Sequence, residues 1–187
     1  KGIGLLMTIP GAAGGVKYIP KCGEQEVREI IQQLIVELSQ SDRLLPGGYL
    51  FMTDLLGNPD LMNRVGKVFA SIYADQKIDV IMTVATKGIS IAHAIARHLN
   101  VPVVVVRRDS KVTEGSTVSI NYVSGSSRRI QTMVLSKRSM KSGQRVLITD
   151  DFMKVGGTMN GMKNLLEEFD CKLAGMAVLV EAEHADE

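Results

Sequence analysis

The sequence lacks tryptophan and is poor in aromatic residues and in cysteine. Aromatic residues make up 4% of the 187 residues, too few to build a stacking surface for single-stranded nucleic acid. The two cysteines, Cys22 and Cys171, exclude a disulfide scaffold and a cysteine-ligated metal cluster. No apolar run reaches the roughly 18 residues of a membrane span, and no charged segment followed by an apolar one marks a signal peptide. We therefore expect a cytoplasmic protein without a membrane partner.

Charge is mild overall but unevenly distributed. The net charge of +2 and the pI of 8.6 are too low for a dedicated nucleic-acid binder. Residues 107–145 carry nine Lys or Arg against two acids, whereas residues 151–187 carry eight acids against three lysines. A solvated face explains most such patterns, and a pocket for a small polyanion is the alternative. Because the chain starts at Lys1 rather than Met, we expect a piece of a longer protein.

The hydrophobic pattern predicts an α/β fold with a parallel sheet flanked by helices. Continuous apolar strands, which are typical of a sheet covered on both faces, alternate with helices. The expected strands are 78–84, 101–107, 145–150 and 173–180, and the helices between them are 88–99 and 156–169. Upstream, residues 3–19 read as a hairpin around a Gly-rich turn. Helices follow from 24 to 39 and from 59, and each has an apolar stripe that we expect to face the core.

About 37 residues separate the second and third strands, and most of them have no helical pattern. Apolar residues alternate with polar ones on both sides of Gly125-Ser126-Ser127, which predicts a long antiparallel hairpin. We expect this hairpin to lie outside the parallel core. Insertions of this length are usually functional, for example as a flap over a site.

The strongest chemical signal is the thirteen-residue run from Val146 to Thr158. An apolar strand delivers two adjacent carboxylates, and a helix opens a few residues later. Carboxylates can accept hydrogen bonds from the hydroxyls of a ribose, and N–H groups at a helix N-terminus bind phosphate. Glycines let a phosphate approach the main chain. A tight turn capped by Thr158 would explain the glycines but not the acid pair. The residues concerned are Asp150, Asp151, Phe152, Met153, Lys154, Val155, Gly156, Gly157 and Thr158.

This run resembles the PRPP-binding motif of the type I phosphoribosyltransferases, where PRPP is 5-phosphoribosyl 1-pyrophosphate. The resemblance implies that fold and PRPP binding, with Mg²⁺ brought in by PRPP rather than held by a metal site of the protein. Val155 stands where the family usually has Thr and cannot offer a hydroxyl to the 5-phosphate.

Two further loops lie at the expected carboxyl ends of parallel strands, where ligands bind in such sheets. Thr86, Lys87 and Gly88 match the pyrophosphate loop of the family. Arg107, Arg108 and Lys111 follow the second strand and bring cations that suit a compact anion. The segment 113–140 resembles the flexible flap of the family.

Across nearly the whole chain the sequence is similar to the purine operon repressors that are built on this fold. The matching segments include Leu45–Tyr49, Lys111–Ser127 and Phe152-Met153-Lys154. The resemblance implies a homodimer that binds PRPP as an effector without turnover and binds duplex operator DNA. Residues 1–20 would be the wing of an N-terminal winged-helix domain, and residues 21–187 the PRPP-binding effector domain. Tyr49 would lie near PRPP.

Two other interpretations stay open. An active purine phosphoribosyltransferase, of the xanthine or adenine type, would share the motif and the fold. A structural subunit that has lost its site is less consistent with the sequence, because such a subunit has no reason to keep Asp150 and Asp151 together.

Overall fold

The computed structural model describes residues 4–108, 115–124 and 129–182. They form two compact units. The first comprises the chain up to Gln76 together with His93–Asn100, and the second comprises Lys77–Ala92 and the chain from Val101 onward. The boundary therefore falls inside helix α4 (Gly88–Leu99). The predicted domain boundary at residue 20, which assigns the first hairpin to a winged-helix domain, stays a prediction.

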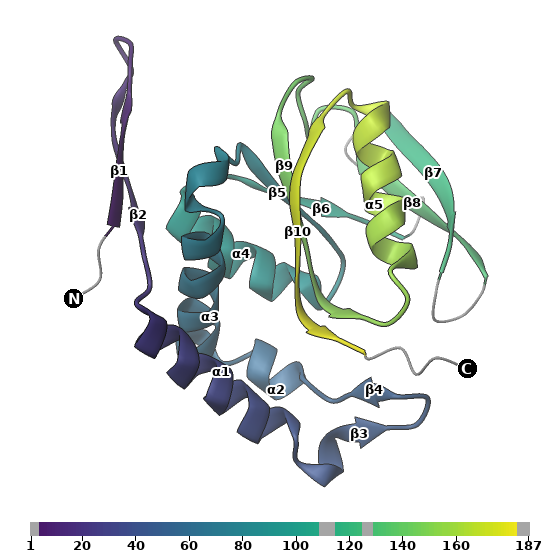
Figure 1. Cartoon of the computed structure of the whole chain (residues 1–187). Coiled ribbons are helices and arrows are strands. Elements are labelled where there is room, and N and C mark those ends of the chain that lie inside the picture. Colours follow the sequence, from purple (N-terminus) through teal and green to yellow (C-terminus); the bar gives the residue numbers. More distant parts are fainter. Residues whose placement is uncertain (1–3, 109–114, 125–128, 183–187) are drawn as a thin grey trace. The chain divides into compact units, whose positions relative to one another are not determined.

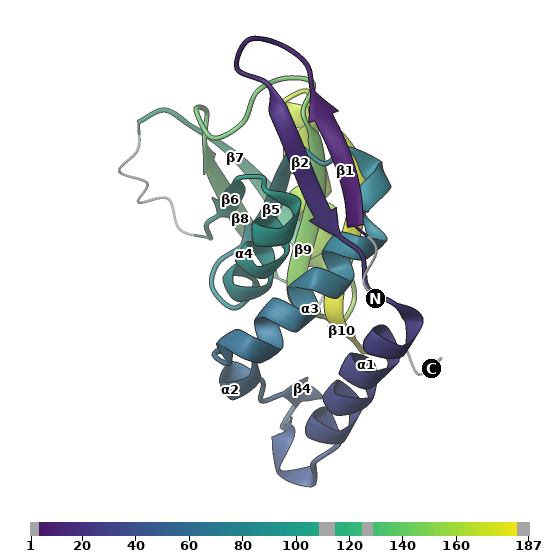
Figure 2. The ribbon, with the colours of Figure 1, turned by 90° about the vertical axis from the view of Figure 1, so that its left-hand side faces the viewer.

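The first unit opens with the expected hairpin. Strands β1 (Gly4–Ile9) and β2 (Gly15–Pro20) pair antiparallel, with Gly4 opposite Pro20. Gly11 makes the turn with a φ of 118°, a conformation that a side chain would disfavour. Figure 2 shows the two strands as a narrow ribbon that leads into helix α1 (Glu24–Leu38). Ile19 of β2 is buried.

A short irregular segment between α1 and α3 was not apparent from the sequence. It contains the 3₁₀ turn η1 (Ser41–Arg43), the two-residue strands β3 (Leu44–Leu45) and β4 (Tyr49–Leu50), and helix α2 (Thr53–Leu56). Helix α3 (Pro59–Ile72) then starts as its sequence predicts, and η2 (Ala74–Gln76) follows it. The Asn58 side chain caps α3 by accepting a hydrogen bond of 3.1 Å from the Leu61 N–H.

The apolar stripe of α1 is not wholly a core face, which corrects the expectation. Ile30 is buried, whereas Ile31 and Ile35 are 47% and 52% exposed. Helical spacing identifies an apolar face but not what covers it. Among the described residues, no helix combines the length and the apolar character needed to cross a bilayer.

The second unit contains the expected parallel sheet, in the strand order β10-β9-β5-β6. The strands are β5 (Val80–Val84), β6 (Val103–Val106), β9 (Arg145–Met153) and β10 (Lys172–Glu181). All three pairings are parallel. Helix α5 (Gly157–Glu168) connects β9 to β10 and buries Met162 and Leu165 in the core cluster. The predicted α/β class with a parallel sheet is confirmed.

The long insertion forms the predicted hairpin, β7 (Thr117–Val123) with β8 (Ile130–Ser136). As expected, it lies outside the parallel sheet and forms its own two-stranded sheet. Its apolar face nevertheless packs into the hydrophobic core, which the sequence did not indicate. Figure 1 shows it against α5, and Tyr122 and Met133 belong to the buried cluster. A Cβ atom at Gly161 of α5 would lie 2.9 Å from the Tyr122 ring and 3.2 Å from the Met133 sulfur. The hairpin thus packs on α5 at Gly161, where the absence of a side chain leaves room for it.

This close approach predicts the sign of a substitution. Alanine replaces glycine in an exposed helix interior with a gain of about 1 kcal/mol, but overpacking a core costs about 1–3 kcal/mol. We expect Gly161→Ala to lower the free energy of unfolding, measured by urea denaturation. The exposed neighbour Asn160→Ala is the control and should not lower it. A rise for Gly161→Ala would mean that β7 and β8 are loosely seated.

Candidate functional site

Two buried carboxylates mark the candidate site. Asp150 and Asp151 lie inside β9, and they are 7% and 8% exposed. β9 runs three residues beyond its predicted end because β10 continues beside it, where the Ala182 N–H donates to the Met153 carbonyl at 2.8 Å. On the other side, the pairing with β5 stops at Thr83 and Thr149. The acid pair therefore lies where β9 leaves the β5 ladder.

The start of helix α4 lies against Asp150, just beyond the point where the pairing of β5 with β9 ends. A Cβ atom at Gly88 would lie 2.8 Å from Asp150 Oδ1 and would collide with Thr83 Oγ1. Glycine is thus the residue that lets α4 begin against the carboxylate. Thr83 Oγ1 and Thr149 Oγ1 are buried and have no hydrogen-bond partner among the described residues. The Ala85–Thr86 peptide bond just before this contact is cis.

The environment of Asp150 favours its protonated form. Burial, the hydrogen bond with Asp151 and the charge of Asp151 raise the pKa of Asp150 to about 7. The Asp151 N–H, which donates to Asp150 Oδ1 at 2.9 Å, and the charge of Arg108 offset part of this rise. An acid whose pKa is shifted this far by burial and a specific charge partner is typical of a functional site.

The predicted phosphate loop follows the acids directly. Phe152 and Met153 end β9, and Lys154 and Val155 lead to Gly156, which caps α5 in a left-handed conformation with a φ of 76°. No side chain caps this helix, and its first helical bond runs from the Asn160 N–H to the Gly156 carbonyl at 2.9 Å. The N–H groups of the first turn, which includes Gly157 and Thr158, have no partner within the helix and can donate to an anion. Val155 is 52% exposed.

The cationic loops lie at the carboxyl ends of the strands, as the sequence predicts. Thr86 and Lys87 are exposed between β5 and α4. Arg107 is exposed after β6, and its backbone pairs with Val134 of β8 through hydrogen bonds of 3.0 and 2.8 Å. Lys111 lies outside the described residues. Tyr49 belongs to the first unit, on β4, where it is 40% exposed.

Thr83 was not predicted at this site, and Arg108 was predicted only as one of the cations that follow the second strand. The Thr83 hydroxyl and the Asp150 carboxylate both lie against Gly88, and Arg108 is close enough for its charge to act on that carboxylate. The signal for Thr83 was available, since it is the one polar residue in the buried strand Val80–Val84. Arg108 differs from Arg107 in nothing that the sequence displays. In the part of the chain that the structure describes, no group of three or more His, Cys, Asp or Glu could hold a metal ion.

Comparison with known proteins gives the family. The phosphoribosyl transferase domain matches residues 52–187. The chain belongs to this family. It is 65% identical over 187 residues, its full length, to the purine biosynthesis transcriptional repressor PurR of Bacillus subtilis, of which it covers 66%. It is 50% identical over 181 residues to the purine biosynthesis transcriptional activator PurR of Lactococcus lactis subsp. lactis, with 97% of the chain and 67% of that relative covered.

These relatives confirm the resemblance to the purine operon regulators within the phosphoribosyl transferase family, and both are named as regulators rather than enzymes. The chain spans about two thirds of their length. Among solved structures, adenine phosphoribosyltransferase from Saccharomyces cerevisiae matches with a TM-score of 0.72 at 22% identity, covering 83% of this chain and 90% of that one. This similarity confirms the type I phosphoribosyltransferase fold.

The raised pKa of Asp150 predicts how stability depends on pH. The folded state keeps a proton that the unfolded state loses, so the free energy of unfolding should fall as the pH rises from 3.8, the ordinary pKa, to about 7. The slope should reach at most about 1.4 kcal/mol per pH unit. We expect Asp150→Asn to flatten this fall in urea denaturation at a series of pH values. Asp75→Asn, at an exposed ion pair, is the control. Parallel curves for the native chain and Asp150→Asn would contradict the assignment.

Proposed function

We propose that this chain is the PRPP-binding effector part of a transcriptional regulator of purine biosynthesis genes, and that it binds PRPP without turning it over. The observation that carries the proposal is the buried acid pair shortly before a helix N-terminus that no side chain caps, in a chain 65% identical to a purine biosynthesis repressor. The higher identity to that repressor than to the related activator favours repression.

Each part of PRPP has a group that suits it. Asp150 and Asp151 accept hydrogen bonds from the ribose hydroxyls, which would relieve two carboxylates that burial leaves poorly solvated. Gly156, Gly157 and Thr158 present N–H groups and a hydroxyl to the 5-phosphate, with Phe152, Met153, Lys154 and Val155 forming the rest of the loop. Lys87 and Arg107 attract the pyrophosphate, which Thr86 and Gly88 also border. Mg²⁺ enters with the pyrophosphate of PRPP, and Tyr49 lies against the ligand.

Regulation requires that PRPP bind the free and the DNA-bound forms unequally. We propose that PRPP weakens binding of the full regulator to duplex operator DNA. Exposed cations on the hairpin, among them Arg129, Lys137 and Arg138, suit phosphate contacts of either ligand. Residues 1–20 would be the wing of a winged-helix DNA-binding domain. The protein would act as a cytoplasmic homodimer.

An active purine phosphoribosyltransferase is the second candidate. The intact acid pair and the uncapped α5 favour it, because catalysis of this kind rests on positioning and charge stabilisation rather than on a covalent intermediate. Val155 opposes it, since its half-exposed side chain offers no hydroxyl to the phosphate.

A phosphorus NMR spectrum distinguishes the two candidates. The chain is mixed with Mg²⁺, PRPP and a mixture of purine bases, and the spectrum is compared with a protein-free control. We expect broadened or shifted PRPP signals and no new nucleotide or pyrophosphate peaks. New peaks of both products would identify an enzyme, and unchanged PRPP signals would remove PRPP as the ligand.

The role of Lys87 can be tested with two ligands. Lys87→Ala should lower the affinity for PRPP by about tenfold, the loss of one charge-assisted hydrogen bond. It should leave the affinity for ribose 5-phosphate unchanged, because that ligand has no pyrophosphate. Calorimetric titration measures both affinities, with the exposed Lys163→Ala on α5 as the matched control. Equal losses for the two ligands would exclude Lys87 from the pyrophosphate contact.

A further inference from the structure

A cavity lies beside β6, an edge strand of the parallel sheet in the second unit. Its volume is about 370 Å³, which is within the range of about 300–1,000 Å³ that ligand pockets occupy. It is lined by β6 and its flanking residues, by β8 and by the turn after β8, through Pro102, Val103, Val104, Val105, Arg107, Val134, Leu135, Ser136 and Ser139. All of these residues belong to the second unit, and the acid pair is not among them.

The cavity is present because β8 leaves β6 after one pair of residues. The Arg107 N–H donates to the Val134 carbonyl at 3.0 Å, and the Val134 N–H donates to the Arg107 carbonyl at 2.8 Å. In the part of the chain that the structure describes, β6 and β8 share no other paired residues. β8 ends at Ser136 and turns, where the Ser139 N–H donates to the Ser136 carbonyl at 3.0 Å. The rest of the outer edge of β6 is therefore not covered by β8.

The backbone of β6 presents its hydrogen-bonding groups alternately to the two sides. In a strand of a parallel sheet, every second residue directs both its N–H and its carbonyl to the same neighbour. The Val106 carbonyl accepts from the Ala85 N–H at the end of β5, at 2.9 Å, whereas Arg107 is directed to β8. Val103 and Val105 share the direction of Arg107, so their N–H and carbonyl groups point away from β5. Among the described residues, no strand pairs with them on that side.

An open edge of this kind is a template for another strand, and proteins usually cover it or blunt it with charges, proline or a bulge. β6 consists of four valines, which do neither. The cavity has β6 on one side and β8 on the other, so it suits a single extended chain. A second copy of this chain that paired through its own β6 would bring its β5 with it, and does not fit between the two strands.

The charges around the cavity favour an acidic chain. Arg107 lines it and is exposed. The turn between Ser136 and Ser139, which both line the cavity, carries the exposed cations Lys137 and Arg138. No Asp or Glu is among the described residues that line it. Charge complementarity of this kind selects partners and speeds their association.

We propose that this cavity is a docking site for an extended, acidic peptide segment of a partner protein. The segment adds a strand to the sheet: its backbone pairs with Val103 and Val105, and its carboxylates meet Lys137 and Arg138. In complexes of this type the main-chain hydrogen bonds supply the affinity and the side chains supply the specificity. The inference goes beyond the proposed function, because strand addition requires neither PRPP nor the acid pair.

Amide hydrogen exchange, followed by NMR for each residue, tests the pairing. The probe is the peptide Glu-Val-Thr-Val-Glu, blocked at both ends and added to the native chain without PRPP. In the free chain we expect Val103 and Val105 to exchange faster than Val104 and Val106, which are directed to β5. Peptide at about ten times its Kd should slow exchange at Val103 and Val105 by about tenfold. Exchange at Val104 and Val106 should stay unchanged.

Two substitutions of one residue form a matched pair. Val105→Pro removes an N–H that faces the cavity and not the β5 ladder, and edge strands tolerate proline at such positions. It should lower the affinity for the labelled peptide, measured by fluorescence anisotropy, by up to about tenfold for the lost hydrogen bond. Val105→Thr keeps the N–H and the branched side chain and should bind as the native chain does. If Val105→Pro fails to fold, a peptide N-methylated at alternate residues removes bonds from the other side and should bind more weakly.

The acidic character of the partner is tested by charge reversal. Lys137→Glu combined with Arg138→Glu should lower the affinity for the peptide by about tenfold. Lys172→Glu, an exposed position on β10 at the opposite edge of the sheet, is the control and should leave it unchanged.

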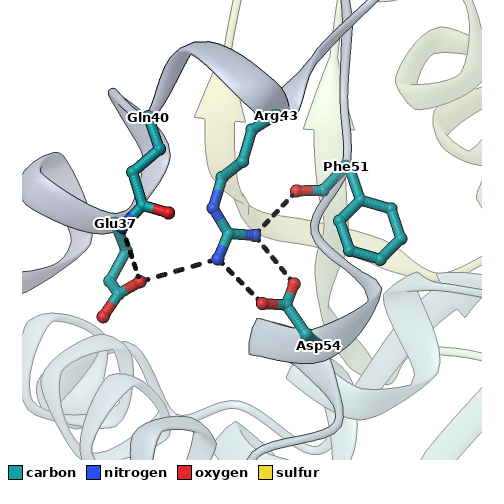
Figure 3. Close-up of polar contacts among 5 residues, drawn as sticks. All are labelled: Glu37, Gln40, Arg43, Phe51 and Asp54. Atoms are coloured by element: carbon teal, nitrogen blue, oxygen red, sulfur yellow. Dashed lines mark hydrogen bonds and ion pairs between the residues drawn. The ribbon is translucent and has the colours of Figure 1, made fainter.

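A variant of the first unit controls for general loss of stability. There the buried Arg43 guanidinium makes two hydrogen bonds to the Asp54 carboxylate, of 2.8 and 2.7 Å (Figure 3). Asp54→Asn weakens this ion pair and should destabilise the fold. It should not change the affinity for the peptide, because no residue of the first unit lines the cavity.

The outcomes are distinct. Slow exchange at Val103 and Val105 in the free chain would show that another segment of this chain covers the edge, and would overturn the inference. Exchange that the peptide leaves unchanged, or equal affinity for the N-methylated peptide, would overturn it as well. Equal affinity for the peptide Lys-Val-Thr-Val-Lys would overturn the assignment of an acidic partner.

Discussion

The structure of the second unit depends on placing two carboxylates inside a buried strand. Taking a carboxylate out of water is costly unless it is paired or protonated. Asp150 meets this constraint partly through the Asp151 N–H and partly by holding a proton toward neutral pH. A position with these properties gains from a ligand that donates hydrogen bonds. The burial of these two carboxylates is therefore better explained by ligand recognition than by a contribution to the stability of the fold. Strongly shifted pKa values are found at binding sites for this reason.

Local sequence patterns predicted most of the strands and helices of this unit, because its strands are largely apolar and are separated by helices. They failed where an element depends on a neighbour distant in sequence. β9 was expected to end at Asp150, yet it continues to Met153 because β10 keeps pairing with it. In the same way, the largest cause of the raised pKa of Asp150 is its burial, which tertiary packing decides. Only the contribution of the adjacent Asp151 could be read from the sequence, and the opposing charge of Arg108 comes from a distant segment.

The β7–β8 hairpin and helix α1 show the same limit of sequence patterns. Alternation on the β7–β8 hairpin and helical spacing on α1 each revealed an apolar face, but neither revealed a partner. The hairpin face turned out to be covered by α5, whose Gly161 admits Tyr122 and Met133, whereas Ile31 and Ile35 of α1 stay exposed. A period identifies which residues share a face, and the choice of partner is made by tertiary packing. The segment from Arg43 to Asp54 was missed for a related reason, since its order comes from a side-chain ion pair rather than from a repeating pattern.

The arrangement of α5 bears on the difference between a sensor and an enzyme. The helix starts directly after the predicted phosphate loop, and the hairpin packs against it further along, at Gly161. A phosphate bound at its first turn would act on a helix that is packed against β7, and packed cores respond as units rather than deform continuously. An enzyme needs its flap to close and reopen in each turnover. A regulator needs ligand binding to alter the element that meets its partner. Under the proposed function, a hairpin packed on α5, the helix proposed to bind the phosphate, would meet that requirement.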